Sequence, residues 1–235
     1  RRERREPLQH LTGRAYFRHL ELEVGPGVFV PRPETELLAG AAIDELRRLV
    51  DAGVAHPRAV DLCAGSGAVA LAMATEVPQS RVAAVEVSDQ ALAYATRNAA
   101  GVGLDLRLGD MADAFPDLLG QVHVVTANPP YIPPEAFESV AVEVRDHDPA
   151  AALWSGADGL DAIRVVARVA AKLLVDGGLV LCEHADVQGE AALEIFASTG
   201  DWTHVRDHRD LAERPRFVTA CRVVRGVAPT GTIAP

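Results

Sequence analysis

One short segment, Asn128-Pro129-Pro130-Tyr131, has the residue types needed to orient a planar nitrogen. The side-chain oxygen of Asn128 and the backbone carbonyl of Pro129 can accept hydrogen bonds from both hydrogens of a carboxamide. An amide nitrogen is a weak nucleophile, so catalysis must come from positioning and from stabilising the developing charge. The prolines have fixed φ and no N–H, and Tyr131 can pack against a flat group. The segment predicts an acceptor site that needs no metal ion and no covalent nucleophile; the alternative is a proline-rich loop that only ends a strand.

A second candidate site is a glycine turn between a predicted strand at 59–63 and a predicted helix, at residues 61–67. Gly65 and Gly67 lack a Cβ, as a backbone requires where it takes positive φ or approaches a ligand closely. Glu86 ends the next predicted strand, roughly twenty residues after the turn, where a carboxylate can accept hydrogen bonds from both hydroxyls of a ribose. Together these features predict a nucleoside cofactor.

Several interpretations of the glycine turn compete. The run at 65–70 fits a relaxed dinucleotide pattern, but the charge of Asp61 would oppose a pyrophosphate there. Ser66 lacks the flanking glycines of a hydrolase nucleophile elbow, because Ala64 and Ala68 stand two residues to each side. The plainest alternative is that the glycines only permit a tight turn. S-Adenosylmethionine has no phosphate and carries an ammonium group, so it suits Asp61 best.

The elements that must position these segments alternate between strand-like and helix-like patterns. Strands are predicted at 59–63, 81–87, near 106, and at 122–126, 179–183, 202–206 and 216–224. Helices are predicted at 36–50, 67–77, from Ser88 to about 100, from about 159 to 175, and near Ala191. We therefore expect a Rossmann-like α/β fold: a mostly parallel seven-stranded sheet with a C-terminal antiparallel strand pair and helices on both faces. Ligands bind such sheets beyond the carboxyl ends of the strands, where both segments would lie.

Composition restricts the class of protein. The chain has 235 residues, 49% of them hydrophobic and 24% charged, which suits one α/β domain. No apolar run approaches the roughly eighteen residues of a membrane span, and no targeting segment is apparent, so we expect a cytoplasmic fragment or processed chain with no membrane partner. The net charge of -10 would repel a phosphate backbone, so nucleic acid is not expected as a direct partner. Cys63, Cys182 and Cys221 form no CxxC pair and are expected to be reduced core residues.

The sequence resembles the HemK/PrmC family of N5-glutamine methyltransferases, which modify the glutamine of the Gly-Gly-Gln loop in peptide chain release factors. The resemblance covers nearly the whole chain and is carried by the segments at 6–13, 30–36, 61–67, 128–131, 158–161 and 214–217. Asn-Pro-Pro-Tyr alone is shared with DNA and RNA amino-methyltransferases, so it identifies the class of acceptor. The Pro-Arg-Pro-Glu-Thr-Glu segment at 31–36 is the more specific marker.

The resemblance implies a class I methyltransferase fold, with S-adenosyl-L-methionine as cofactor and S-adenosyl-L-homocysteine as product. It implies a substrate site at Asn128, Pro129, Pro130 and Tyr131, with catalysis assigned to Asn128, Pro129 and Tyr131. The implied cofactor-binding residues are Phe29, Pro31, Thr35, Asp61, Cys63, Ala64, Gly65, Ser66, Gly67, Glu86, Met111 and Asn128. Two positions depart from the family, which usually has glycine where Cys63 stands and often an aromatic residue where Met111 stands. The thioether of Met111 can still cover an adenine face.

The resemblance also implies a domain organisation. Residues 1–30 would be a hairpin or linker left from an N-terminal helical domain, 31–225 the methyltransferase domain, and 226–235 a flexible tail. Alternation around Leu20, Leu22 and Val24, followed by Gly25-Pro26-Gly27, predicts the hairpin. Without the helical domain, recognition of a release factor would weaken while the chemical site stays intact.

The expected function is direct in-line methyl transfer to the glutamine amide of a release factor, with the proton lost afterwards to water or a weak acceptor. Two alternatives stay open: a DNA or RNA amino-methyltransferase that uses the same turn, and a catalytically silent cofactor-binding module. The acidic charge disfavours the first, and the presence of Asn128 and Tyr131 disfavours the second. His147 and His184 are expected to be structural or solvated.

Overall fold

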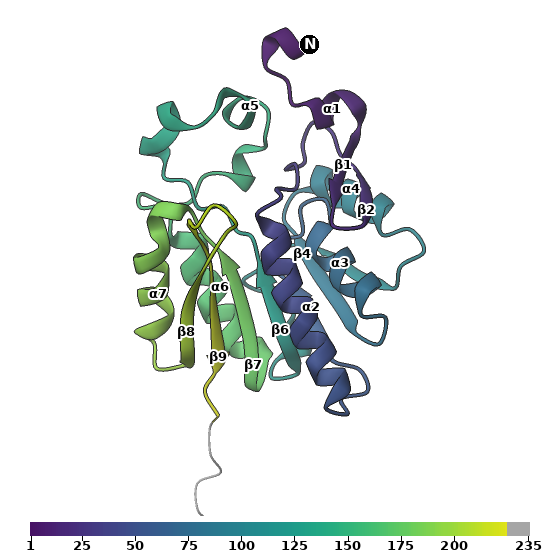
Figure 1. Ribbon diagram of the computed structural model, residues 1–235, viewed down its shortest axis with the longest axis vertical. Coiled ribbons are helices and arrows are strands. Elements are labelled where there is room, and N and C mark those ends of the chain that lie inside the picture. The colour runs from purple at the N-terminus through teal and green to yellow at the C-terminus, as the bar shows by residue number, and fades with distance from the viewer. Residues whose placement is uncertain (225–235) are drawn as a thin grey trace, which may run out of the picture.

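The computed structural model describes residues 1–224 and has the alternating order of elements expected from the sequence (Figure 1). The main sheet contains β3 (Arg58–Asp61), β4 (Arg81–Glu86), β5 (Leu104–Leu108), β6 (Val122–Ala127), β7 (Leu174–Glu183), β8 (Trp202–Arg209) and β9 (Pro215–Arg222). The helices are α1 (Leu8–Thr12), α2 (Thr35–Asp51), α3 (Ala68–Glu76), α4 (Asp89–Asn98), α5 (Val142–Arg145), α6 (Asp161–Leu173) and α7 (Gly189–Ala197). The tail expected at 226–235 lies outside the described residues.

The seven strands lie in the order β5-β4-β3-β6-β7-β9-β8. The pairs β3–β4, β3–β6, β4–β5 and β6–β7 are parallel, whereas β9 runs antiparallel to both β7 and β8. The predicted fold class, with its C-terminal antiparallel pair, is therefore confirmed. Strands β4 and β5 are added on one side of β3, and the chain then crosses to the other side of β3 to form β6. The strand order therefore reverses between β3 and β6. Ligands of open α/β sheets bind beyond the carboxyl ends of the strands at this switch.

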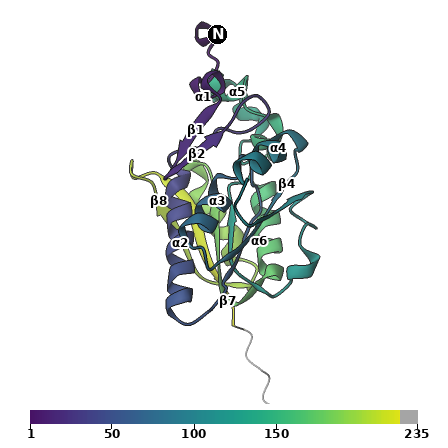
Figure 2. The same ribbon diagram turned by 90° about the vertical axis from the view of Figure 1, so that its right-hand side faces the viewer.

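Helices cover both faces of the sheet, as the two views show (Figures 1 and 2). Helices α2 and α3 bury one face, with fully buried side chains that include Leu38, Ile43, Leu46, Leu71 and Met73. The opposite face is covered by α6 and α7, whose buried side chains include Ile163, Val166, Ala170, Leu173 and Phe196. The buried residues of α6 recur three and four apart, which places them on one stripe of that helix.

The boundary between α6 and β7 differs from the sequence prediction. Helix α6 ends at Leu173, and β7 begins immediately at Leu174, whereas the sequence suggested a helix to 175 and a strand from 179. The register between β6 and β7 shifts between Val122 and Val124, which accommodates the extra strand residues. Gly177 within this stretch has a φ of 77°, a value that breaks regular strand geometry and that glycine tolerates.

The predicted N-terminal hairpin is present, as β1 (Arg14–Phe17) paired antiparallel with β2 (Leu20–Glu23). Its side chains Phe17 and Leu22 are buried in the same core cluster as α2 and α3. The hairpin therefore shares a core with the main domain, and packing is continuous across residue 30. Within residues 1–224, no helix is both long enough and apolar enough to cross a membrane.

Candidate active site

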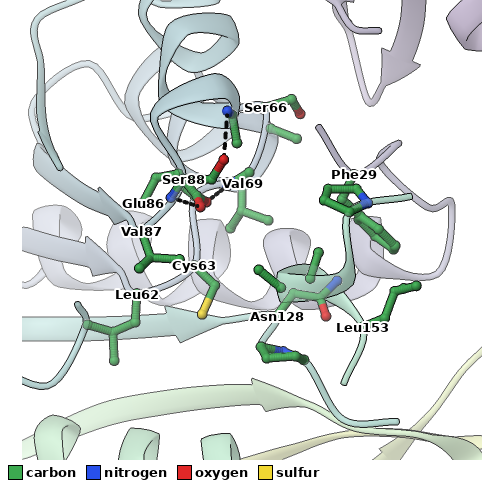
Figure 3. Close-up of a pocket in the computed structure, with 18 of the residues that line it drawn as sticks. Phe29, Leu62, Cys63, Ser66, Val69, Glu86, Val87, Ser88, Asn128 and Leu153 are labelled. Carbon is green, nitrogen blue, oxygen red and sulfur yellow. Dashed lines mark hydrogen bonds between the residues drawn. The ribbon is translucent and has the colours of Figure 1, made fainter. Parts of the chain in front are cut away.

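A cavity of about 360 Å³ lies at the strand-order switch, where the segments that follow β3, β4 and β6 meet. Figure 3 shows Glu86 and Val87 on one side of it and Asn128, Phe29 and Leu153 on the other. The predicted site residues that line it are Phe29, Pro31, Thr35, Cys63, Ala64, Gly65, Ser66, Glu86, Met111, Asn128, Pro130 and Tyr131. The structure thus brings the glycine turn and the Asn-Pro-Pro-Tyr segment to a shared cavity. Asp61, Gly67 and Pro129 are not part of the wall.

The glycine turn uses its two glycines differently. Gly65 has a φ of 54°, and a Cβ added there would meet no atom within 4 Å, so its backbone faces open space. Gly67 has a φ of 85°, caps the start of α3, and donates its N–H to the carbonyl of Ala64 at 2.7 Å. A Cβ at Gly67 would lie 3.3 Å from Leu71, so this glycine serves the turn and its packing instead of lining the cavity.

The carboxylate of Glu86 joins the glycine turn to the end of β4. One of its oxygens accepts the N–H of Gly65 at 2.8 Å, and the other accepts the N–H of Ser88 at 2.9 Å. Ser88 in turn caps α4, because its Oγ accepts the N–H of Ala91 at 3.3 Å. Each carboxylate oxygen can accept a second hydrogen bond, and the side chain lines the cavity. The arrangement suits a ligand with two adjacent hydroxyls.

Asp61 ends β3 just before the turn and does not line the cavity, although a contact with a cofactor was predicted. It is 1% exposed, and its Oδ1 accepts a hydrogen bond from Thr126 of β6 at 3.0 Å. Its Oδ2 is buried and has no hydrogen-bond partner among the described residues. Burial raises the pKa of Asp61 to about 7, and the Thr126 hydrogen bond opposes that rise. Asp61 therefore joins β3 to β6, and its carboxylate does not reach the cavity wall.

The two positions that depart from the family, Cys63 and Met111, touch each other. The Sγ of Cys63 donates to the Sδ of Met111 across 3.9 Å, and both residues line the cavity. Burial raises the pKa of the Cys63 thiol, so the thiol stays neutral near pH 7. The pair forms a polarizable, apolar section of wall near Glu86, where a flat ring can pack.

Asn128 follows β6 and is held by the first turn of α2. Its Nδ2 donates to the Oγ1 of Thr35 at 3.2 Å, which leaves its Oδ1 for a ligand. Thr35 in turn donates to the Oε2 of Glu183 at 2.7 Å. Glu183, at the end of β7, is 1% exposed, and Tyr131 donates its hydroxyl to the other oxygen, Oε1, at 3.4 Å. Four side chains from three separate parts of the sequence thus form one hydrogen-bonded chain.

Glu183 was missed at the sequence level. Burial raises its pKa to about 7, while the Thr35 hydrogen bond and the nearby charge of Arg216 work in the opposite direction. The available signal was its place as an acidic residue that ends an apolar strand, the same place that Asp61 and Glu86 occupy.

The backbone of the Asn-Pro-Pro-Tyr segment is fixed after Tyr131. Ile132 forms a parallel bridge to Trp154, with its N–H bonded to the carbonyl of Leu153 at 2.8 Å. The side chain of Gln188 donates to the Tyr131 carbonyl at 2.9 Å. Gly159, with a φ of 76°, leaves room for that carbonyl, because a Cβ there would clash with it. These contacts, including Gln188, were not predicted from the sequence.

A segment at 142–153 contributes to the cavity wall and was also not predicted as part of it. Val144, Pro149 and Leu153 line the cavity. An ion pair between the partly exposed Arg32 and the buried Asp148, at 2.6 Å, ties this segment to the Pro-Arg-Pro-Glu-Thr-Glu segment. Burial raises the pKa of Asp148 to about 6, although the positive charge of Arg32 lowers it. Figures 1 and 2 both show α5, which begins this segment, at the same end of the molecule as the β1–β2 hairpin.

His184 is confirmed as a structural residue. It is fully buried, and its two ring nitrogens contact the Ala185 carbonyl at 2.8 Å and the Asp207 carboxylate at 3.0 Å. Cys63, Cys182 and Cys221 are free thiols, but only Cys182 is fully buried, and Cys63 belongs to the cavity wall.

Comparison with known proteins agrees with this geometry. A protein-family profile described as a methyltransferase domain matches residues 59–147. A release factor glutamine methyltransferase of Streptomyces coelicolor is 60% identical over 94% of this chain and 77% of its own length. A 4-amino-L-phenylalanine/4-methylamino-L-phenylalanine methyltransferase of Streptomyces pristinaespiralis is 46% identical over 87% of this chain and 70% of its own.

Among solved structures, a release factor-specific protein-(glutamine-N5) methyltransferase of Alicyclobacillus acidocaldarius superposes with a TM-score of 0.52 and 26% identity. The superposition covers 86% of this chain and 99% of that chain. The chain belongs to the family of release factor glutamine methyltransferases.

Proposed function

We propose that this protein transfers the methyl group of S-adenosyl-L-methionine to the side-chain amide nitrogen (N5) of the glutamine in the Gly-Gly-Gln loop of a cytoplasmic peptide chain release factor. The observation that carries the proposal is the shared cavity of Asn128 and the glycine turn. The Nδ2 of Asn128 is already bonded to Thr35, so its Oδ1 is the group that remains for an acceptor nitrogen. Relatives named as release factor glutamine methyltransferases support the choice of substrate.

The residues present fit S-adenosylmethionine. The Glu86 carboxylate keeps lone pairs for the ribose hydroxyls, and the open face of Gly65 gives the ligand close access to the backbone. Val87, Met111 and Cys63 supply apolar wall for the adenine ring. The cavity volume of about 360 Å³ lies in the usual range for small-molecule sites. When bound, the cofactor supplies an electrophilic methyl group on a sulfonium sulfur.

The protein's share of the reaction is to hold the acceptor nitrogen. The Oδ1 of Asn128 accepts one amide hydrogen, which fixes the orientation of the nitrogen. The carbonyl of Pro129 was expected to accept the second hydrogen, but Pro129 does not line the cavity. The cofactor would supply the methyl carbon to this nitrogen and would keep the electron pair of its S–C bond on sulfur. The Asn128 oxygen carries a partial negative charge, so it stabilises the positive charge that develops on the nitrogen. The nitrogen then loses one proton to water, which restores a neutral amide.

A second acceptor class has a specific observation in its favour. The Streptomyces pristinaespiralis relative is named for methylation of 4-amino-L-phenylalanine. An aromatic amine also has a flat NH₂ group with a delocalised lone pair, and the oxygen of Asn128 can accept from it in the same way. The relatives named for glutamine methylation include one with higher identity, so glutamine is the leading acceptor.

The test is mass spectrometry of acceptors incubated with the protein and S-adenosylmethionine. We expect one added methyl group on the Gly-Gly-Gln peptide of a release factor. Parallel reactions contain free 4-amino-L-phenylalanine, a DNA duplex and an RNA, with Asn128→Ala as the control variant. Methylation of the free amine or of a nucleic acid, with none on the release factor, would replace the proposed substrate. Cofactor binding with no transfer to any acceptor would favour the catalytically silent module.

A further inference from the structure

We infer that Thr35 and Glu183 are positioning residues that fix the side-chain amide of Asn128, so that its oxygen and not its nitrogen faces the acceptor. The inference rests on the proposed function to the extent that Asn128 contacts the acceptor. An amide oxygen can only accept a hydrogen bond, so an Asn128 oxygen held toward the cavity selects a substrate that has an N–H donor. Thr35 and Glu183 thereby contribute to the choice of substrate.

The direction of each hydrogen bond follows from the chemistry of the groups. An ionised carboxylate can only accept, so the hydroxyl hydrogen of Thr35 must point to Glu183, 2.7 Å away. The Oγ1 of Thr35 then has only lone pairs left for Asn128. Asn128 must therefore present its NH₂ group to Thr35, at 3.2 Å, and its Oδ1 to the cavity. This orientation of the Asn128 amide follows from the donors and acceptors around it, and does not rest on which of its two terminal atoms is assigned as nitrogen.

The surroundings keep Glu183 in place for this task. Its Oε1 accepts from the hydroxyl of Tyr131 at 3.4 Å, so both oxygens receive a donor. Thr35 is 4% exposed and Glu183 1% exposed, which excludes bulk water as a competing partner. Turning the Asn128 amide over would place its oxygen against the oxygen of Thr35, two acceptors without a hydrogen between them.

Protonation of Glu183 removes this directional control. A neutral carboxyl group can donate to Thr35, whose own hydrogen is then free to bond the oxygen of Asn128 and turn the amide over. The groups that face Glu183 are Thr35 and Glu34 at the start of α2, Tyr131, and Arg216 of β9. Burial raises the pKa of Glu183 to about 7, so methyl transfer should fall as the pH falls through about 7.

Three substitutions test the positioning role. Thr35→Val keeps the side-chain shape but removes both the donor and the acceptor, and kcat should fall by about 10- to 100-fold. Thr35→Ser restores the hydroxyl and should recover most of that loss. Glu183→Gln leaves one acceptor and one donor, so the direction of the Thr35 hydroxyl is no longer set, and kcat should fall by about 10-fold. The affinity for S-adenosylmethionine, measured by calorimetry, should stay within about 3-fold of the parent protein in Glu183→Gln, because Glu183 does not line the cavity.

The pH profile separates positioning from a general structural effect. In Glu183→Gln, kcat should no longer fall as the pH drops through about 7. Asp61 and Asp148 are still present and also have raised pKa values, of about 7 and about 6. Asp207→Asn is the matched control: its carboxylate bonds His184, the residue after Glu183, and its rate and pH profile should equal those of the parent protein. A profile in Glu183→Gln identical to the parent profile, or an active Thr35→Val, overturns the inference.

A measurement without any acceptor separates this inference from the proposed substrate. The side-chain NH₂ of Asn128, observed by NMR with labelled asparagine, should exchange slowly with water in the parent protein and at least 10-fold faster in Glu183→Gln. Equal exchange rates refute the positioning role, whatever the acceptor. Slow exchange in a parent protein that does not methylate glutamine refutes the substrate alone and leaves the positioning role standing.

Discussion

Replacing Glu183 with glutamine should stabilise the fold at alkaline pH and have little effect at acid pH. Burial raises the pKa of Glu183 from its ordinary value of 4.5 to about 7, so the folded protein holds a proton that the unfolded chain releases. Below about pH 4.5 both states are protonated and the group costs no stability. Between about pH 4.5 and pH 7 the unfolded chain has lost this proton while the folded protein still holds it, so stability falls across this interval and levels off once the folded state ionises above about pH 7.

The size of the effect follows from the two pKa values. A rise from 4.5 to about 7 corresponds to about 3 kcal/mol, at about 1.4 kcal/mol for each pH unit. Most of this, about 2 kcal/mol or more, is lost between pH 5 and pH 8. Glutamine has no proton to lose, so the advantage of Glu183→Gln over the parent protein should grow by that amount across the interval.

The assay is urea denaturation of both proteins at pH 5 and pH 8, with Asp207→Asn as a further control. Asp61 and Asp148 also have raised pKa values, but the parent protein and both variants contain them. Their effects on stability therefore cancel when a variant is compared with the parent protein. Any hydrogen bond that the new amide fails to make lowers the free energy of unfolding by the same amount at pH 5 and at pH 8. If the stability difference between Glu183→Gln and the parent protein is the same at pH 5 and pH 8, Glu183 does not carry a raised pKa in the folded state.

The remaining predictions concern the backbone and the two ends of the cavity. Gly159→Ala adds positive-φ strain and a clash with the Tyr131 carbonyl, so both stability, by about 2 kcal/mol or more, and transfer should fall. Gly177→Ala adds the same strain at a φ of 77° but meets open space, so urea denaturation should show a loss of only about 1 kcal/mol with turnover kept. Asn128→Ala should lower kcat by about 100-fold or more while calorimetry shows cofactor affinity unchanged. Glu86→Gln should weaken S-adenosylmethionine binding by about 10-fold, because a charged acceptor for two hydroxyls is lost.

The strands of the sheet and the helices that cover it were predictable, because each is encoded by a local pattern of apolar and polar residues. Alternating and helical spacing of apolar residues set the order of elements, and Ser88 was recognisable as a helix cap that the structure contains. The end of α6 was not predictable, because apolar residues at 174 and 175 suit a helix and a strand equally. Tertiary pairing with β6 decides in favour of the strand.

The candidate site was predictable only where its residues are contiguous in sequence. The glycine turn and the Asn-Pro-Pro-Tyr segment each carry a local signature, and Glu86 sits at a fixed distance after the turn. The bond between Thr35 and Glu183 joins residues 148 apart, and no local pattern encodes it. Asp61 differs from the prediction in another way: its side chain accepts a hydrogen bond from Thr126 and is not among the residues that line the cavity.

The choice between a protein glutamine and a small aromatic amine cannot be made by Asn128 alone. Both acceptors have an NH₂ group with a delocalised lone pair, and one fixed oxygen serves either of them. Discrimination must therefore come from groups that meet the rest of the acceptor. The segment at 142–153 is placed for this, because Val144, Pro149 and Leu153 line the cavity and the Arg32–Asp148 ion pair holds the segment in place. The chemistry of transfer and the selection of the acceptor thus depend on different parts of the chain, so relatives can share the first while differing in the second.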